Sequence, residues 1–379
     1  MKKILIAPNS FKGCADSITI SNYFKEYLAD LKEYKIIVKP ISDGGDGFLD
    51  VCKSNFNLKE LKYQVTTPYD ESSLRCNAGY DENDETIYIE SAKVLGLNLI
   101  PSGRKNPMLL SSKGVGDLLK KIAGDIKKKK IKADKVIIGI GGTGTNDLGL
   151  GAASRFGLKL IDAGGNECQV IPKNYKKIKL LDWKRIDLPF EIFCVIDVEN
   201  PLTGENGASR TFARQKGASD NDIESLEEGF QKLVNIFIEE KLIKGAETLP
   251  GAGGGLAAGL SVFLNAKIIT AENFILNTLR IGKLKNEIDY LITGEGSFDP
   301  QSIMKKGAWI LMRNFQDSAQ KIFLCCGIIE ERIKPELNPS VIPIELSKFF
   351  NNKKESINNI QKGIESAALE IRKILGHSL

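Results

Sequence analysis

The amino-acid sequence predicts an α/β protein in which helices cover a parallel sheet. Near its start, strand-like apolar runs alternate with segments of helical periodicity, which is the order typical of such a sheet. Several of the apolar runs are unbroken, as in strands that are buried on both faces. The chain has 379 residues, a length that favours two domains.

The first elements establish the alternation. Residues 4–7 are predicted to form a strand, and residues 18–31 carry apolar side chains at helical spacing. Residues 36–38 form a second strand, and a further helix begins at Phe48. This order of strand, loop, helix and strand predicts parallel pairing.

The next segment has a different character. Short strand-like runs at residues 63–67, 74–80 and 86–90 are separated by polar turns. Runs of this kind are typical of antiparallel hairpins rather than of another parallel unit. We therefore expect the chain to leave its first domain near residue 62.

A helix is predicted to begin at Ser111 or Ser112, because either hydroxyl can cap a helix N-terminus. Its apolar side chains recur at amphipathic spacing as far as Ile126. Residues 136–138 then form a buried strand, and residues 148–156 are of helical type.

The glycine-rich segment 139–147 joins that strand to the following helix. A turn of this kind offers unpaired backbone N–H groups and the positive end of a helix dipole, which together favour an anion such as phosphate. Its glycines let the backbone approach a ligand closely. The segment is therefore the first candidate for a binding site.

The second half continues the α/β pattern. Strands are predicted at residues 190–196, 288–292 and 321–325, and a second glycine-rich turn at 251–260 enters a helix. Apolar residues between 357 and 375 recur at helical spacing and predict a closing helix.

Five of the predicted strands share one feature: each ends in a loop that combines glycine with Asp, Asn, Ser, Thr or Lys. These strands begin near Ile4, Ile36, Val136, Ile192 and Ile288. Ligands of parallel sheets bind at the carboxyl ends of strands, so we expect the five loops to form one composite cleft.

Composition excludes several classes of protein. The net charge is +5, but no basic stripe with interleaved aromatic residues occurs, so we expect neither nucleic-acid nor membrane binding. No apolar run reaches the length of a membrane span or of a signal peptide, and we expect a cytoplasmic protein. Seven cysteines, an odd number without a Cys-x-x-Cys pair, fit a reducing compartment.

The single histidine, His377, is third from the end. A Ser-His-Asp or Cys-His nucleophile and a histidine metal site are therefore excluded. Any general base must be Asp, Glu or Lys, and any metal should be a hard cation held by oxygen.

The glycine turn allows a competing interpretation as an NAD site. The spacing Gly139-x-Gly141-x-x-Gly144 matches the dinucleotide fingerprint, and Asp162 lies near the position of a ribose-binding acid. Against an NAD-dependent oxidoreductase, Gly139 falls inside the strand, and the polar residues 145–147 have no role in dinucleotide packing. A non-catalytic small-molecule sensor is a further alternative.

Carboxylates and one lysine at strand ends favour phosphoryl transfer instead. A Mg²⁺–nucleotide site needs one or two carboxylates, and the reaction needs a cation and an acceptor for the substrate proton. Lys12 can supply the charge, although it can equally be a solvated loop residue, and an Asp in a glycine turn can be a turn former alone. The strand-end carboxylates are Asp43, Asp46, Asp147, Asp197, Glu295 and Asp299.

Many ordered motifs match one family along almost the whole chain. They are the segments at residues 6–13, 43–47, 90–92, 106–107, 114–116, 139–147, 197–202, 204, 206–208, 215–218, 251–253 and 293–296. On these motifs the chain resembles bacterial glycerate kinases of the first type, the group of glycerate 2-kinases and 3-kinases.

The resemblance implies phosphorylation of D-glycerate with ATP and Mg²⁺, to 2-phosphoglycerate or 3-phosphoglycerate. It also implies two α/β domains with an active-site cleft between them. One is a discontinuous Rossmann-like domain of residues 1–62 plus 275–379, and the second is an α/β domain of residues 63–274 with the antiparallel hairpin region. A homodimer is left open.

We assign roles on this basis. Asp197 is the first choice for general base and Asp43 the second, while Lys12 and Ser10 bind glycerate or the transferring phosphoryl group. The glycine turn holds one anionic group, either a nucleotide phosphate or the glycerate carboxylate. Its expected binding residues, with those of the neighbouring loops, are Gly141, Gly142, Thr143, Thr145, Asn146, Asp147, Asn200, Gly253 and Gly294. Expected Mg²⁺ ligands are Glu295, Asp299 and Asp46.

Two departures from the family pattern affect this assignment. One lies downstream, where the family tends to show Gly-Lys-Ala-Pro and this chain has residues 305–308, Lys-Lys-Gly-Ala, without proline. The family usually has Arg and Leu after Gly-Glu-Gly, whereas this chain has Ser297 and Phe298. The positive charge of that loop is missing, and Lys305 or Lys306 is a candidate to replace it. The change bears on substrate preference, since the core loops are intact.

Overall fold

The computed structural model describes residues 1–197, 200–246, 249–303 and 307–377. The chain divides into two compact units: unit 1 comprises Met1–Asp43, Asp50–Asn57 and Thr270–Leu379, and unit 2 comprises Gly44–Leu49 and Leu58–Ile269. Unit 1 is thus discontinuous in sequence. The short segment Gly44–Leu49 is assigned to unit 2, away from the residues on either side of it.

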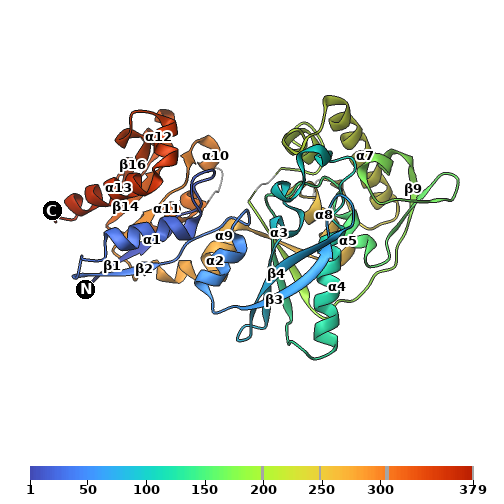
Figure 1. Ribbon diagram of the computed structural model, residues 1–379, viewed down its shortest axis with the longest axis horizontal. Coiled ribbons are helices and arrows are strands. Elements are labelled where there is room, and N and C mark those ends of the chain that lie inside the picture. The colour runs from blue at the N-terminus through green and yellow to red at the C-terminus, as the bar shows by residue number, and fades with distance from the viewer. Residues whose placement is uncertain (198–199, 247–248, 304–306, 378–379) are drawn as a thin grey trace. The chain divides into compact units, whose positions relative to one another are not determined.

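Unit 1 is built on a five-stranded parallel sheet (Figure 1). The strands, in spatial order, are β16 (Val341–Glu345), β14 (Lys321–Cys326), β12 (Tyr290–Thr293), β1 (Lys2–Ile6) and β2 (Tyr34–Val38). Numbered along the chain, this is the 2-1-3-4-5 order of a doubly wound fold, in which the strand order reverses between β1 and β12. The parallel sheet expected from the sequence is confirmed.

Helices α1 (Ser17–Tyr27) and α13 (Ile360–Ile374) lie side by side in unit 1 (Figure 1). Asp16 caps α1 by accepting a hydrogen bond from the Thr19 N–H at 2.7 Å. The closing helix was predicted as one element, but Asn359 separates α12 (Lys353–Asn358) from α13. Periodicity alone did not show this break, because apolar positions continue across it.

Unit 2 contains a six-stranded mixed sheet. Its spatial order is β11 (Lys267–Thr270), β10 (Glu191–Ile196), β6 (Lys135–Gly139), β5 (Thr86–Glu90), β4 (Ser73–Asp81) and β3 (Lys59–Thr66). Strands β10, β6 and β5 are parallel, whereas β3, β4 and β5 form the antiparallel hairpins predicted for this region.

Unit 2 contains four main helices. They are α4 (Lys113–Lys127), α5 (Leu150–Ser154), α7 (Asp220–Glu239) and α8 (Leu256–Leu264). A separate antiparallel sheet contains β8 (Glu167–Cys168), β7 (Lys159–Asp162) and β9 (Ile178–Asp182). Ser112 is the N-cap residue of α4, which confirms the predicted start of this helix, but its side chain makes no capping hydrogen bond.

The remaining elements are short. The helices are α2 (Phe48–Asn55), α3 (Ala92–Leu95), α6 (Ala208–Phe212), α9 (Ala271–Asn273), α10 (Pro300–Ile303) and α11 (Gly307–Phe315), and the strands β13 (Ser297–Phe298) and β15 (Ile328–Ile329) pair with each other. Within the described ranges, no helix is both long and apolar enough to cross a membrane.

Candidate active site

A pocket of about 260 Å³ lies in unit 1. It collects five residues that the sequence nominated from loops far apart along the chain: Ser10, Lys12, Asp43, Glu295 and Asp299. The loops that follow β1 and β12 supply most of these residues, and the strand order reverses between those two strands. Ligands of doubly wound sheets bind at this reversal, so the pocket lies where the fold favours a site.

Backbone contacts join the two loops at the reversal. The Asn9 N–H donates to the Gly294 carbonyl at 2.9 Å, and the Thr293 hydroxyl donates to the Ala7 carbonyl at 2.9 Å. Gly294 was expected to bind substrate, but a Cβ there would overlap the Cys325 carbonyl of the neighbouring strand. The absence of a side chain at Gly294 therefore allows close packing between strands, and its expected role in binding substrate stays a prediction.

Asp43 is nearly buried in the pocket and is oriented by Asn9. The Asn9 Nδ2 donates to Asp43 Oδ2 at 3.1 Å, and the Asn9 Oδ1 accepts from the Ser10 N–H at 2.8 Å. One amide thus fixes both the carboxylate and the Ser10 backbone. Sequence reasoning did not select Asn9, although the motif that contains it was recognised.

Three carboxylates, on Asp43, Glu295 and Asp299, line the pocket together. Asp299 also caps the N-terminal end of α10, because its Oδ1 accepts a hydrogen bond from the Ser302 N–H at 3.2 Å. Among the described residues, no group of three or more His, Cys, Asp or Glu side chains is arranged to hold a metal ion. Mg²⁺ commonly takes only one or two carboxylates together with substrate phosphates, so the oxygen-rich lining fits it.

Asp46, the third expected metal ligand, belongs to unit 2. It is exposed and lies against the glycine turn, since a Cβ at Gly142 would overlap Asp46 Oδ1. A Cβ at Gly141 would likewise come within 2.6 Å of the Gly45 Cα. The nominated metal set is thus divided between the two units.

Three carbonyl groups within residues 141–145 of the glycine turn accept hydrogen bonds from other parts of the chain. The donors are Ser91 Oγ to the Gly141 oxygen (3.4 Å), Leu97 N to the Gly142 oxygen (3.1 Å) and Lys216 Nζ to the Thr145 oxygen (2.7 Å). A trans peptide directs its N–H opposite to its C=O, and the described chain has no cis peptide. The N–H groups of Gly142, Thr143 and Asn146 therefore point away from these donors.

Several polar atoms of the turn have no protein partner in the described chain. They include the N–H groups of Gly142, Thr143 and Asn146 and the side-chain atoms Thr143 Oγ1, Thr145 Oγ1, Asn146 Nδ2 and Asn146 Oδ1. Asn146 and Thr145 are fully buried. Gly142 is exposed, whereas Thr143, Thr145 and Asn146 are buried. Buried polar groups are nearly always hydrogen-bonded, so the unpartnered atoms of these three residues indicate a bound ligand or ordered water. Successive N–H groups of this kind favour an anion.

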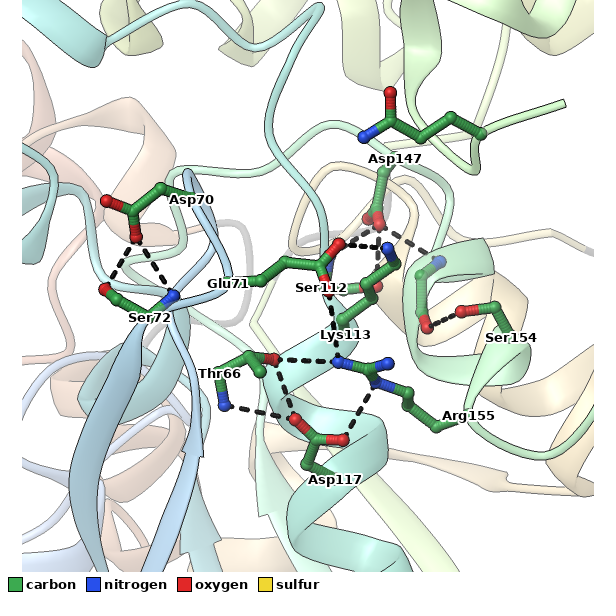
Figure 2. A network of polar contacts seen from close by, with 12 residues as sticks. Thr66, Asp70, Glu71, Ser72, Ser112, Lys113, Asp117, Asp147, Ser154 and Arg155 are labelled. Atoms are coloured by element: carbon green, nitrogen blue, oxygen red, sulfur yellow. Dashed lines mark hydrogen bonds and ion pairs between the residues drawn. The ribbon is translucent and has the colours of Figure 1, made fainter.

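Asp147 was predicted to contact substrate, but its carboxylate is hydrogen-bonded to other residues of the protein (Figure 2). Its Oδ2 accepts from the Ser112 N–H at 2.6 Å, the Ser112 hydroxyl at 2.7 Å and the Gly151 N–H at 3.1 Å. Burial raises the pKa of the Asp147 carboxyl, and these hydrogen bonds oppose the rise. Because the side chain is fully buried and engaged, it holds the turn, and this corrects the prediction.

A polar network continues from Ser112 along α4 (Figure 2). The next residue, Lys113, pairs with Glu71, and Glu71 approaches Arg155 at 3.6 Å. Arg155 follows α5 and pairs with Asp117 of α4 at 2.8 Å. The network connects α4 to the end of α5, and Ser112 connects it to Asp147 at the end of the glycine turn.

Lys216 is a site residue that sequence reasoning missed, although its motif was part of the family resemblance. It is only 3% exposed, and burial lowers its pKa to about 7, with the Asp147 charge acting in the opposite direction. A lysine looks like a surface residue in a sequence, and only the tertiary structure reveals that it is enclosed.

The second glycine turn packs against the first. Gly253, Gly254 and Gly255 have φ values of 67°, 68° and 83°, which L-residues rarely adopt. A Cβ at Gly254 would overlap the Thr145 carbonyl, and one at Gly253 would come within 2.6 Å of Ile140 Cγ2. Gly253 therefore has a packing role, and its expected role in binding stays a prediction.

The loop after β10 contains the nominated Asp197 and Asn200. Asp197 is half-buried directly after the strand, and the Asn200 Nδ2 donates to the Asn206 carbonyl at 2.8 Å. Asn200 thus shapes its own loop. Residues 198–199 of the family motif and the nominated Lys305 and Lys306 lie outside the described residues.

The geometry opposes the NAD interpretation. Asp162 ends β7 in the separate antiparallel sheet, and its Oδ1 accepts from the N–H groups of Gly164 and Asn166, both at 2.9 Å. A ribose-binding acid belongs at the end of the neighbouring parallel strand. Asp162 is instead an exposed turn former.

Comparisons with known proteins agree on one family. A family model described as the glycerate kinase family matches residues 4–375. The chain is 33% identical to a glycerate 2-kinase of Escherichia coli (strain K12), over 80% of this chain and 79% of that protein. It is 29% identical to a glycerate kinase of Neisseria meningitidis serogroup B, over 87% and 86% of the two chains.

A solved structure agrees in fold. A crystal structure from Salmonella typhimurium LT2, assigned as a glycerate kinase 2, superposes with a TM-score of 0.76 and covers 99% of this chain and 100% of that chain. The identity is 22%, so this likeness shows the fold alone.

Proposed function

This chain is an enzyme of the glycerate kinase family, and from that premise we propose that it transfers the γ-phosphoryl group of ATP to D-glycerate. The E. coli relative is named a glycerate 2-kinase, which favours 2-phosphoglycerate over 3-phosphoglycerate as the product. Substrate chemistry alone does not separate the two products, because glycerate carries one hydroxyl group on carbon 2 and another on carbon 3.

The unit 1 pocket is the observation that carries the proposal. It combines the Lys12 cation with the hydroxyl of Ser10 and the carboxylates of Asp43, Glu295 and Asp299. Phosphoryl transfer needs such a set, because positive charge must offset the negative charge that spreads over the transferring group. Serine hydroxyls and backbone N–H groups can bind the remaining oxygens.

Mg²⁺ fits the carboxylates of this pocket, with Glu295 and Asp299 as the proposed ligands. When bound, the ion would neutralise phosphate charge. Lys12 adds a second positive charge from the loop after β1. Asp46, which lies against the glycine turn within unit 2, is the third carboxylate proposed as a Mg²⁺ ligand.

Two acids are proposed to accept the proton of the substrate hydroxyl. Asp197 of unit 2 is the first choice and Asp43 of unit 1 the second. The Asp43 carboxylate is oriented in the pocket by a hydrogen bond from the Asn9 side-chain amide. The unpartnered N–H groups of the glycine turn are proposed to bind an anionic group of one substrate.

A cytoplasmic location completes the proposal. The described cysteines are all free, including the adjacent buried pair Cys325 and Cys326. Burial raises the pKa of Cys194 to about 12, so this thiol stays protonated and acts as a small apolar side chain. Free thiols fit a reducing compartment, which also supplies ATP.

A coupled assay of ADP formation tests the function. We expect ADP release that requires both D-glycerate and Mg²⁺. Absence of glycerate-dependent ADP would refute the kinase proposal. A thermal shift with NADH but none with ATP would instead indicate an oxidoreductase, and binding without turnover would indicate a sensor.

The same assay tests the assignment of Asp197 as the general base. Asp197→Asn should lower kcat by about 10²- to 10⁴-fold, the usual contribution of a general base, with little change in KM. Asp187→Asn, which changes an exposed acid of the same unit, should leave turnover unaltered. If Asp197→Asn retains near-normal kcat while Asp43→Asn does not, the base is Asp43.

A further inference from the structure

Lys216 is a buried lysine whose ammonium group contacts the glycine turn. It ends the short segment Arg214–Lys216 and is only 3% exposed. Within the described chain its ammonium group makes one hydrogen bond, to the Thr145 carbonyl at 2.7 Å. Burying an ammonium group is costly unless it is paired, so its presence here calls for a function.

The hydrogen bond fixes one peptide group. Since the Thr145 carbonyl points towards Lys216 and the peptide is trans, the Asn146 N–H of the same peptide points to the opposite side. That N–H, both polar atoms of the Asn146 amide and the Thr145 hydroxyl have no partner in the described part of the chain. The unsatisfied groups therefore belong to the very peptide that Lys216 orients.

Charge gives a second reason for a lysine at this place. Asp147 follows Asn146 directly and is fully buried, so its negative charge alone would oppose an anion at the turn. The charge of Asp147 also acts on Lys216 and raises its pKa, against the effect of burial. The Lys216 ammonium compensates this charge and leaves the turn able to accept an anion.

We propose that Lys216 is a positioning residue of the anion site: it orients the 145–146 peptide and offsets Asp147 without touching substrate. The ligand class is a carboxylate or a phosphate oxygen, both of which accept hydrogen bonds from N–H groups. The inference rests on the proposed function, because it assigns this site to one of the two substrates.

Steady-state kinetics of Lys216→Met test the proposal. Met has similar length but neither charge nor donor, and losing this charge-assisted hydrogen bond should raise one KM by about 10- to 100-fold. Only the substrate bound at the turn should be affected, while the other KM and kcat stay within about threefold. A rise for ATP assigns phosphate to the turn, and a rise for D-glycerate assigns the carboxylate.

Two matched variants complete the design. Lys232→Met removes a surface lysine that also donates to a backbone carbonyl, that of Lys176 at 2.6 Å, and it should leave both KM values unchanged. Lys216→Arg keeps a cationic donor and should recover part of the lost affinity. Unchanged KM values in Lys216→Met, or a loss confined to kcat, would overturn the proposal.

A measurement independent of turnover separates failure of this proposal from failure of the kinase assignment. Hydrogen exchange of the wild-type segment 140–148 is followed with and without ATP or D-glycerate. One of the two should slow exchange at Asn146, and Lys216→Met should remove that protection. Equal protection in the folded variant, or none in the wild type with either ligand, would overturn the inference whatever the assay shows.

Discussion

Asp147 shows how much a residue's role depends on its partners in space. As a strand-end carboxylate beside a glycine turn, it qualified as a ligand of substrate. In the folded chain it accepts hydrogen bonds from Ser112, Gly149 and Gly151 and is fully buried. The sequence could not show this, because Ser112 lies 35 positions away and its hydroxyl served equally well as a predicted helix cap.

Asp147→Asn should therefore affect stability more than binding. The asparagine NH₂ cannot accept the N–H groups of Ser112 and Gly151, and at least one buried donor loses its partner. We expect a loss of about 2–3 kcal/mol in the free energy of unfolding, measured by urea denaturation. Asp162→Asn, in an exposed turn with similar local bonds, should cost less than about 1 kcal/mol. Equal losses would contradict the internal role of Asp147.

Lys216 predicts a pH dependence of stability. Its pKa is about 7 in the folded chain and 10.5 when unperturbed, so between these values the unfolded state binds more protons. Stability should therefore rise with pH from about 7 to 10.5 by up to roughly 1.4 kcal/mol per pH unit from this group. Urea denaturation of wild type and Lys216→Met should show the wild type gaining relative to the variant. A constant difference across this range would contradict the lowered pKa.

At the scale of elements, local pattern predicted most of the structure. The strands at β1, β2, β6, β10 and β12 and the antiparallel hairpins follow from apolar runs and turns, which act over few residues. The break at Asn359 and the true partner of Ser112 were missed, since periodicity carries no information on tertiary contacts. The glycine turns were predicted correctly, but the close packing of Gly253 and Gly254 against the first turn was not predicted.

Gly254→Ala tests the packing of the two turns. The new Cβ would meet the Thr145 carbonyl at a backbone φ of 68°, so both overlap and left-handed strain are introduced. We expect a loss of about 2–5 kcal/mol in the free energy of unfolding. The control Gly165→Ala has a φ of 81° but no atom within 4 Å, and should cost only about 1–2 kcal/mol. Indistinguishable losses in the two variants would show that the turns do not pack as described.

For the whole molecule, the chain length predicted two domains, and the family resemblance implied that both are α/β and that the first is discontinuous. Neither predicted that Gly44–Leu49 groups with unit 2, because that assignment depends on contacts with β6 and β10. Unit 1 brings together Ser10, Lys12, Asp43, Glu295 and Asp299, whereas unit 2 carries the glycine turn, Asp46 and Asp197. Strand ends therefore identified candidate residues, and the fold sorted them into two sets.

The central proposal is that this enzyme transfers a phosphoryl group from ATP to D-glycerate. Phosphorus NMR of the enzyme with ATP, Mg²⁺ and D-glycerate tests it most directly. The account predicts loss of the γ-phosphate signal only when glycerate is present, with a new phosphomonoester signal. That signal should be a doublet from coupling to the single proton on carbon 2, whereas a triplet would place the transfer at the 3-hydroxyl. Unchanged ATP, or inorganic phosphate as the sole product, would contradict the claim.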